Sequence, residues 1–107
     1  MKIKQLQSEV AEWSNRNFPN NQPHQPLLGV GEEVGELMHA HLKMEQGIRG
    51  PADRLYVEKC DAVGDILIYL ADYCERNKID MEAAVDDAWA IVKRRDWTKD
   101  KINGTQD

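Results

Sequence analysis

Four stretches of the chain repeat apolar residues at spacings of three and four, which is the period of an α-helix with one buried face. These stretches predict helices over about residues 2–17, 26–46, 54–76 and 80–96. Three prolines between residues 18 and 26 predict a stiff loop instead. Gly47 is expected to end the second helix, and Asp53 and Asp80 to cap the third and the fourth. Because the connection between the second and third helices is short, we expect them to be antiparallel neighbours in an all-α four-helix bundle.

Each predicted helix carries an apolar stripe that is expected to face the core. The stripes consist of Ile3, Leu6, Val10 and Trp13; Val30, Val34, Leu37, His41 and Met44; Val63, Ile66, Leu67 and Leu70; and Met81, Ala84, Val85, Ala88, Ile91 and Val92. The polar tail at 98–107 has little to bury, so no ordered structure is expected there without a neighbouring subunit.

Carboxylates lie along one edge of both central helices. Glu33 and Glu36 flank the stripe of the second helix, and helical spacing places four acids on one face of the third: Glu58, Asp61, Asp65 and Asp72. A charge partly removed from water must be paired, neutralised or bound to a metal. Glycines accompany these acids at 29, 31, 35 and 64, although each costs about 1 kcal/mol relative to alanine in a helix. Together these features predict a closely approached oxygen-ligand cage for a hard cation such as Mg²⁺.

Length and charge narrow the function further. A chain of 107 residues suggests one domain whose core is modest, so self-association is expected. A net charge of −5 argues against a nucleic-acid surface, and the absence of a long apolar run or signal peptide argues for the cytoplasm. Cys60 and Cys74 fall on one predicted helix about 21 Å apart, so they are expected to be reduced, buried, apolar residues.

Two motifs resemble those of the MazG-like nucleoside triphosphate pyrophosphohydrolases over roughly residues 24–97. The first is Glu-Glu-x-x-Glu at 32–36, and the second is Gly-Asp-Ile-Leu-Ile-Tyr-Leu at 64–70. Glu32, Glu33, Glu36 and Asp65 match the family signature of Glu-Glu-x-x-Glu followed by Glu-x-x-Asp. Ala62 stands where that signature has its second-helix glutamate. Either Asp61 replaces it, which the register of the second motif favours, or Glu58 and Asp61 form the pair one turn earlier.

The resemblance implies a MazG-like fold, assembled as a homodimer or homotetramer. It implies Mg²⁺-dependent hydrolysis, with Mn²⁺ as a substitute, of a nucleoside triphosphate, preferably a deoxynucleotide, to the monophosphate and pyrophosphate. The biological role would be control or cleaning of the nucleotide pool. The implied metal ligands are Glu33, Glu36, Asp61 and Asp65, and the implied catalytic residues are Glu32 and Glu33.

Five further residues are candidates for substrate binding, each with a simpler alternative. His24, in the proline-rich loop, contacts the substrate or is merely solvated. Lys43 contacts phosphate or pairs along its own helix. Tyr69 stacks on a base or is structural. Lys93 and Arg95 contact phosphate or complement the dipole of the last helix.

Two other classes of protein also fit the acidic helices. One is an interaction module whose acidic face binds a basic partner without turnover. The other is a di-iron carboxylate protein, which normally requires Glu-x-x-His on two helices. The sequence supplies this spacing once, with Glu36 and His39.

Overall fold

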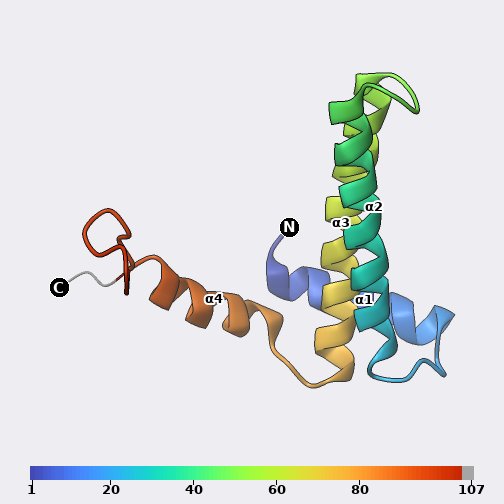
Figure 1. Cartoon of the computed structure of the whole chain (residues 1–107). Coiled ribbons are helices and arrows are strands. Elements are labelled where there is room, and N and C mark those ends of the chain that lie inside the picture. Colours follow the sequence, from blue (N-terminus) through green and yellow to red (C-terminus); the bar gives the residue numbers. More distant parts are fainter. Residues whose placement is uncertain (105–107) are drawn as a thin grey trace.

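A computed structural model of the chain describes residues 1–104 and contains four α-helices and no strand within that range, which confirms the all-α class (Figure 1). Helix α1 covers Ile3–Asn17, α2 Gln25–Gln46, α3 Ala52–Arg76 and α4 Met81–Val92. Among these residues no helix is long and apolar enough to cross a membrane.

The helix ends follow the predicted signals with two exceptions. Gly47 adopts the left-handed conformation at φ 68° and ends α2, and the Asp80 carboxylate accepts a hydrogen bond from Ala83 N at 3.1 Å, so both predictions are confirmed. Asp53 is not a cap, because α3 begins after Pro51 and Asp53 lies in its first turn. The fourth helix ends at Val92, so residues 93–96 are not helical as predicted.

Helices α2 and α3 form a long antiparallel hairpin, and α1 packs across the end of α3 (Figure 1). The hairpin buries the small or apolar residues Ala40, Leu55 and Ala62 between its helices. The core under α1 consists of Val10, Ala71, Cys74 and Met81. This arrangement leaves one side of the hairpin open beside α1, and the acids lie there.

The predicted four-helix bundle does not form within one chain, because α4 points away from the hairpin (Figure 1). Of its predicted inward residues, Met81 is buried, whereas Ala84, Val85, Ala88, Ile91 and Val92 are exposed. Trp13, Val34, His41, Val63 and Leu67 are likewise exposed rather than in the core. Cys74 is buried as expected, but Cys60 is exposed. The apolar pattern therefore exceeds what a single chain covers.

The described part of the tail, residues 98–104, forms turns that fold back on Asp96. Asp96 N donates to Gly104 O at 3.1 Å and closes residues 96–104 into a loop. Gly104 has φ 64° and lies under the Trp97 ring, where an added Cβ would come within 2.7 Å of ring atoms. The tryptophan supplies the packing that the polar tail itself lacks. Residues 105–107 of the predicted tail lie outside the described range.

Candidate functional site

Three carboxylates of α2 form a cluster on the open side of the hairpin. Glu32, Glu33 and Glu36 each place an oxygen within 4.8 Å of the oxygens of the other two. Their spacing of one, three and four residues turns all three toward the same region of a helix. Glu33 is buried with 8% exposure, while Glu32 and Glu36 are exposed. Clustered oxygens of this kind are ligands for a hard divalent cation.

Glu33 is the most constrained member of this acidic cluster. Its Oε2 atom is buried and has no hydrogen-bond partner among the described residues. Burial raises the pKa of Glu33 above its ordinary value, and the negative charges of Glu36, Asp65 and Glu32 raise it further. A buried carboxylate without a donor is unfavourable unless a proton or a cation completes it. Either a proton or a bound cation can therefore complete the Glu33 carboxylate.

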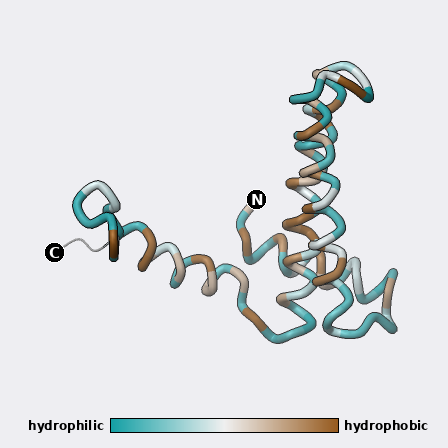
Figure 2. Tube along the Cα trace, viewed as in Figure 1, coloured by the Kyte–Doolittle hydropathy of each residue, from teal (hydrophilic) through white to brown (hydrophobic). Residues whose placement is uncertain are grey.

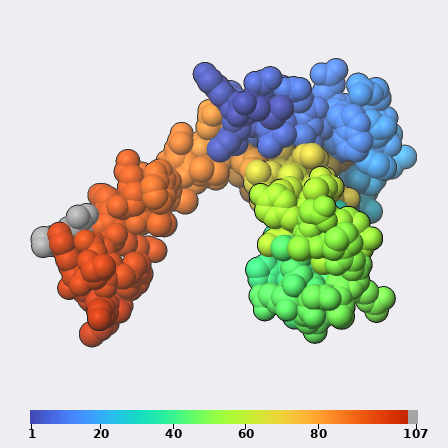
Figure 3. Space-filling view, turned by 90° about the horizontal axis from the view of Figure 1, so that it is seen from above, coloured from blue at the N-terminus to red at the C-terminus, as the bar shows by residue number. Residues whose placement is uncertain are grey.

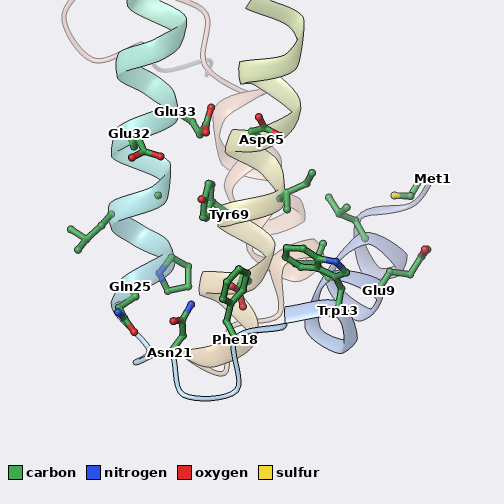
Figure 4. A pocket seen from close by; sticks show the side chains of 17 residues that line it. Met1, Glu9, Trp13, Phe18, Asn21, Gln25, Glu32, Glu33, Asp65 and Tyr69 are labelled. Atoms are coloured by element: carbon green, nitrogen blue, oxygen red, sulfur yellow. The ribbon is translucent and has the colours of Figure 1, made fainter. Parts of the chain in front are cut away.

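Helix α3 adds acids from the opposite side. Figure 4 shows Asp65 directed toward the same opening as Glu32, Glu33 and Tyr69. Asp61 does not line that opening but a second hollow of about 590 Å³, which adjoins it. This hollow shares Glu32 and Glu36 with the cluster, and it is also lined by Asp65, Glu58 and His39. Of the four predicted metal ligands, Glu33 and Glu36 meet in the cluster, whereas Asp65 and Asp61 lie outside it and line the adjoining hollows.

A groove of about 870 Å³ leads away from the cluster between α1, the α1–α2 loop and the hairpin (Figure 4). Glu32, Glu33 and Asp65 line one end of this groove. The other end is mainly aromatic and apolar, with the Glu9 carboxylate beside it, and it includes Trp13 and Phe18, which contact edge to face with ring centroids 5.7 Å apart. The groove therefore joins a strongly acidic end to an aromatic end.

Tyr69 lies between the two ends of the groove. Its ring packs so closely on Gly29 that an added Cβ would lie 2.3 Å from ring carbons, which confirms the close approach predicted for that glycine. Gly31, Gly35 and Gly64 have no described atom within 4 Å of an added Cβ, so no contact within the described chain requires a glycine at these three positions. Burial raises the pKa of Tyr69, and the surrounding carboxylates raise it further. Its hydroxyl therefore remains a hydrogen-bond donor at neutral pH.

The α1–α2 loop, which forms one wall of the groove, is fixed by the end of α3. The Arg76 guanidinium donates to the carbonyl oxygens of Phe18 and Asn21, each at 3.0 Å. Asn77 Nδ2 donates to Pro23 O at 2.8 Å. These bonds replace the regular backbone pairing that Pro19 and Pro23 disfavour in the loop, whereas the third proline, Pro26, lies in the first turn of α2. They hold Phe18 and Asn21 at the groove. The sequence pattern indicated this loop as a substrate contact, but it did not indicate that Arg76 and Asn77 anchor it.

Asp72 lines the same groove as Asp65, as its spacing predicts, but it is neutralised by an ion pair. It is buried against α1, where its carboxylate accepts hydrogen bonds from Ser14 Oγ at 2.8 Å and Arg76 Nε at 2.9 Å. Helical spacing placed Asp72 with Asp65, but α1 covers only the part of α3 that contains Asp72. The arginine that compensates it, Arg76, is one turn further along the same helix.

The remaining candidates for substrate binding are not brought to the groove within the described chain. His24 is exposed at the start of α2, and Lys43 donates to Gln46 Oε1 at 2.9 Å, a hydrogen bond to a neutral side chain three residues further along the same helix. Lys93 and Arg95 follow α4, far from the hairpin in Figure 1. Trp13 was expected in the core but lines the groove. The exposure of this large aromatic ring in the structure is typical of a binding surface.

Comparison of the chain with protein-family models and with curated proteins finds no match. The geometry of the site is therefore the basis for assigning a function.

Proposed function

We propose that the chain is a Mg²⁺-dependent pyrophosphohydrolase that converts a nucleoside triphosphate, preferably a deoxynucleotide, to the monophosphate and pyrophosphate. The observation that carries this proposal is the unpartnered, buried Oε2 of Glu33 within a carboxylate cluster at the end of an aromatic groove. The cluster suits a cation that holds phosphates, and the groove suits a planar base. The MazG-like motifs at 32–36 and 64–70 support the same assignment, with a homodimer or homotetramer as the assembly.

The residues present fit a hard cation, because every donor in the cluster is a carboxylate oxygen. Glu33 and Glu36 from α2 and Asp65 from α3 would hold Mg²⁺, or Mn²⁺ in its place, with Asp61 as a further ligand at the exposed end. When bound, the cation would neutralise the phosphate oxygens, which the net charge of −5 would otherwise repel. Its ligands would then no longer oppose one another's ionisation.

Glu32 is the candidate general base of the reaction. It is exposed at the edge of the cluster and lines both hollows, so water and substrate reach it from either side. In the proposed step its carboxylate accepts a proton while the water oxygen bonds to the α-phosphorus. The bond from the α-phosphorus to the bridging oxygen breaks, and pyrophosphate leaves. Glu33 contributes negative charge at the buried end of the cluster and serves as a ligand.

The aromatic end of the groove is suited to the nucleoside. Trp13 and Phe18 offer ring faces and edges for a base, and Asn21 offers amide donors and acceptors beside them. The protonated Tyr69 hydroxyl lies between the base and the acids, where it is positioned to donate to a sugar or phosphate oxygen. This layout places the base and the triphosphate at opposite ends of one groove.

The two alternative classes explain less of this geometry. A docking surface for a basic partner needs exposed charge, whereas Glu33 is buried. A di-iron centre needs a second Glu-x-x-His, and α3 offers only carboxylates to the hollow that contains His39. Neither alternative uses the aromatic groove.

The test is incubation of the protein with a panel of nucleoside triphosphates and Mg²⁺, followed by separate analysis of phosphate, pyrophosphate and nucleotides. We expect pyrophosphate and monophosphate in equal amounts, and no nucleoside diphosphate. Glu33→Gln, which keeps the shape of the side chain, is expected to abolish turnover. Formation of orthophosphate and diphosphate as first products would refute the assignment.

A further inference from the structure

Helix α4 and the hairpin leave a wide hollow between them. Figure 3 shows the two as separate arms that project from the region of α1. Helix α4 is anchored at its first residue, where Met81 is buried and its N–H donates to Gln7 Oε1 at 2.9 Å. Beyond that point its apolar residues Val85, Trp89 and Val92 are exposed, and Trp89 reaches 59% exposure. Figure 2 shows hydrophobic positions continuing along this arm.

The hairpin has a matching uncovered face opposite its acids. On α2 this face contains Val34, Met38 and Leu42, and on α3 it contains Tyr56, Val63 and Leu67, all of them exposed. Val34 is two residues from Glu36 and Leu67 is two residues from Asp65, so each lies about 160° around its helix from the acid. We call these six residues the back face. A shallow hollow lined by Leu37, Met38 and Leu42 lies on it.

The exposed area of the chain is too large for a stable monomer of its size. The chain exposes 8015 Å², whereas a compact monomer of 12.3 kDa exposes about 6,100 Å². Its radius of gyration is 17.5 Å, compared with about 13 Å for a compact domain of this length. The excess of about 1,900 Å² per chain would give a dimer interface of about 3,800 Å². That area lies within the roughly 2,000 to 5,000 Å² that obligate homodimers bury.

We propose that α4 of one chain packs on the back face of a second copy, and that the second copy's α4 packs in return on the first. Both surfaces belong to the same chain, so a two-fold axis pairs each α4 with a back face and leaves neither uncovered. Charge also favours a second copy as the partner. Residues 93–95 directly follow α4 and are the sequence's only run of three cations, and a second copy of the chain carries a net charge of −5, which attracts them. This inference specifies the interface of the proposed homo-oligomer and does not depend on the proposed chemistry.

The native thiols provide a readout of this interface. Cys60 is exposed and lies on the back face, since it is one turn from Tyr56 and three residues from Val63, whereas Cys74 is buried in the core. In the proposed dimer α4 of the partner covers Cys60. Slow reaction of Cys60 with a maleimide would therefore report a covered back face.

The experiment measures the mass by light scattering and the rate of thiol labelling for the full chain at micromolar concentration. We expect a mass at least twice 12.3 kDa and slow labelling for the wild type. Trp89→Glu on α4 and Met38→Glu on the back face alter exposed side chains, so each is expected to leave the helices intact, give a monomer and label at least tenfold faster. Asn15→Glu, on the exposed side of α1, introduces the same charge away from both surfaces and is expected to remain oligomeric.

Three results would overturn the inference. The first is a wild-type monomer with freely reactive Cys60. The second is a compact monomer with protected Cys60, which would show that α4 folds back on its own hairpin. The third is an oligomer that Met38→Glu dissociates and Trp89→Glu does not, because α4 would then lie outside the interface. A wild type that assembles as proposed but hydrolyses no nucleotide would refute the proposed function alone.

Discussion

Arg76 and Asp72 form a buried ion pair one helical turn apart, with Nε and Oδ1 separated by 2.9 Å and both side chains about nine-tenths covered. The same guanidinium donates to Ser14 Oγ on α1 and to two carbonyl oxygens of the α1–α2 loop. One residue pair therefore links α1, α3 and the wall of the groove. Because these donors and acceptors satisfy one another, the loss of either member leaves a buried charge without compensation.

Asp72→Asn is expected to lower the free energy of unfolding by roughly 3 to 5 kcal/mol, because Arg76 would remain charged in a buried position. Ser14→Ala removes a neutral hydroxyl that donates to Asp72 and accepts from Arg76 but leaves the ion pair in place, so it is expected to cost less, about 2 kcal/mol. Urea unfolding of both variants measures the difference. Equal losses would show that the ion pair does not anchor α1 to α3.

Gly29→Ala is expected to disturb the groove more than the fold. The added Cβ would overlap the Tyr69 ring, so the ring must move away from the acidic cluster. Tyr69 fluorescence and the Michaelis constant for the triphosphate are expected to change.

The matched control is Gly35→Ala on the same helix, where an added Cβ meets no described atom within 4 Å. This control is expected to gain up to about 1 kcal/mol of stability through helix propensity alone. A gain of that size at Gly29 with an unchanged Michaelis constant would contradict the packing described.

The raised pKa of Glu33 predicts a pH-dependent stability in the metal-free protein. As pH rises above the ordinary value of 4.5, the unfolded chain loses this proton before the folded chain does. The free energy of unfolding therefore falls until the pH passes the raised pKa of the folded state. Glu33→Gln cannot lose this proton, so its stability relative to the wild type is expected to increase with pH across that window.

Urea unfolding at a series of pH values with a chelator present measures this effect. Glu12→Gln, which alters an exposed carboxylate on α1, serves as the control and is expected to differ little from the wild type at any pH. A constant difference between Glu33→Gln and the wild type across the series would contradict the raised pKa.

The helices and the acidic cluster were predictable because they depend on local spacing. The period of the apolar residues indicated all four helices, and Glu32, Glu33 and Glu36 meet because three and four residues make one turn. Gly29 was correctly associated with a close approach, since only the absence of a Cβ permits the position of the Tyr69 ring. These features require no knowledge of which other segment packs on the helix.

The wrong predictions concern residues whose burial or pairing depends on segments that are distant in the sequence. Asp72 has the spacing of the acidic face, but α1 covers it and Arg76 neutralises it. Val85 and Leu67 have the pattern of core residues, yet both remain exposed in one chain. Apolar periodicity indicates that a face will be covered but not by which chain. The groove formed by Trp13 and Phe18 depends on how α1 crosses α3, which the local sequence does not determine.

Asp65→Asn is expected to reduce turnover by more than about a hundredfold while preserving the fold. The two side chains have nearly the same volume, but the amide is neutral and a weaker ligand for a hard cation. Without metal, the melting temperature is expected to hold or rise slightly, because repulsion with Glu33 is relieved. Mg²⁺ is expected to raise the melting temperature of the wild type and to have much less effect on the variant. Equal effects of Mg²⁺ on both proteins would place the cation elsewhere.

The most direct test of the proposed function is hydrolysis of a nucleoside triphosphate in water enriched in heavy oxygen, with Mg²⁺ present and mass analysis of both products. If water attacks the α-phosphorus beside Glu32, one heavy oxygen is expected in the nucleoside monophosphate and none in the pyrophosphate. Heavy oxygen in the pyrophosphate or in orthophosphate, or the absence of any Mg²⁺-dependent hydrolysis across the panel of triphosphates, would contradict the assignment.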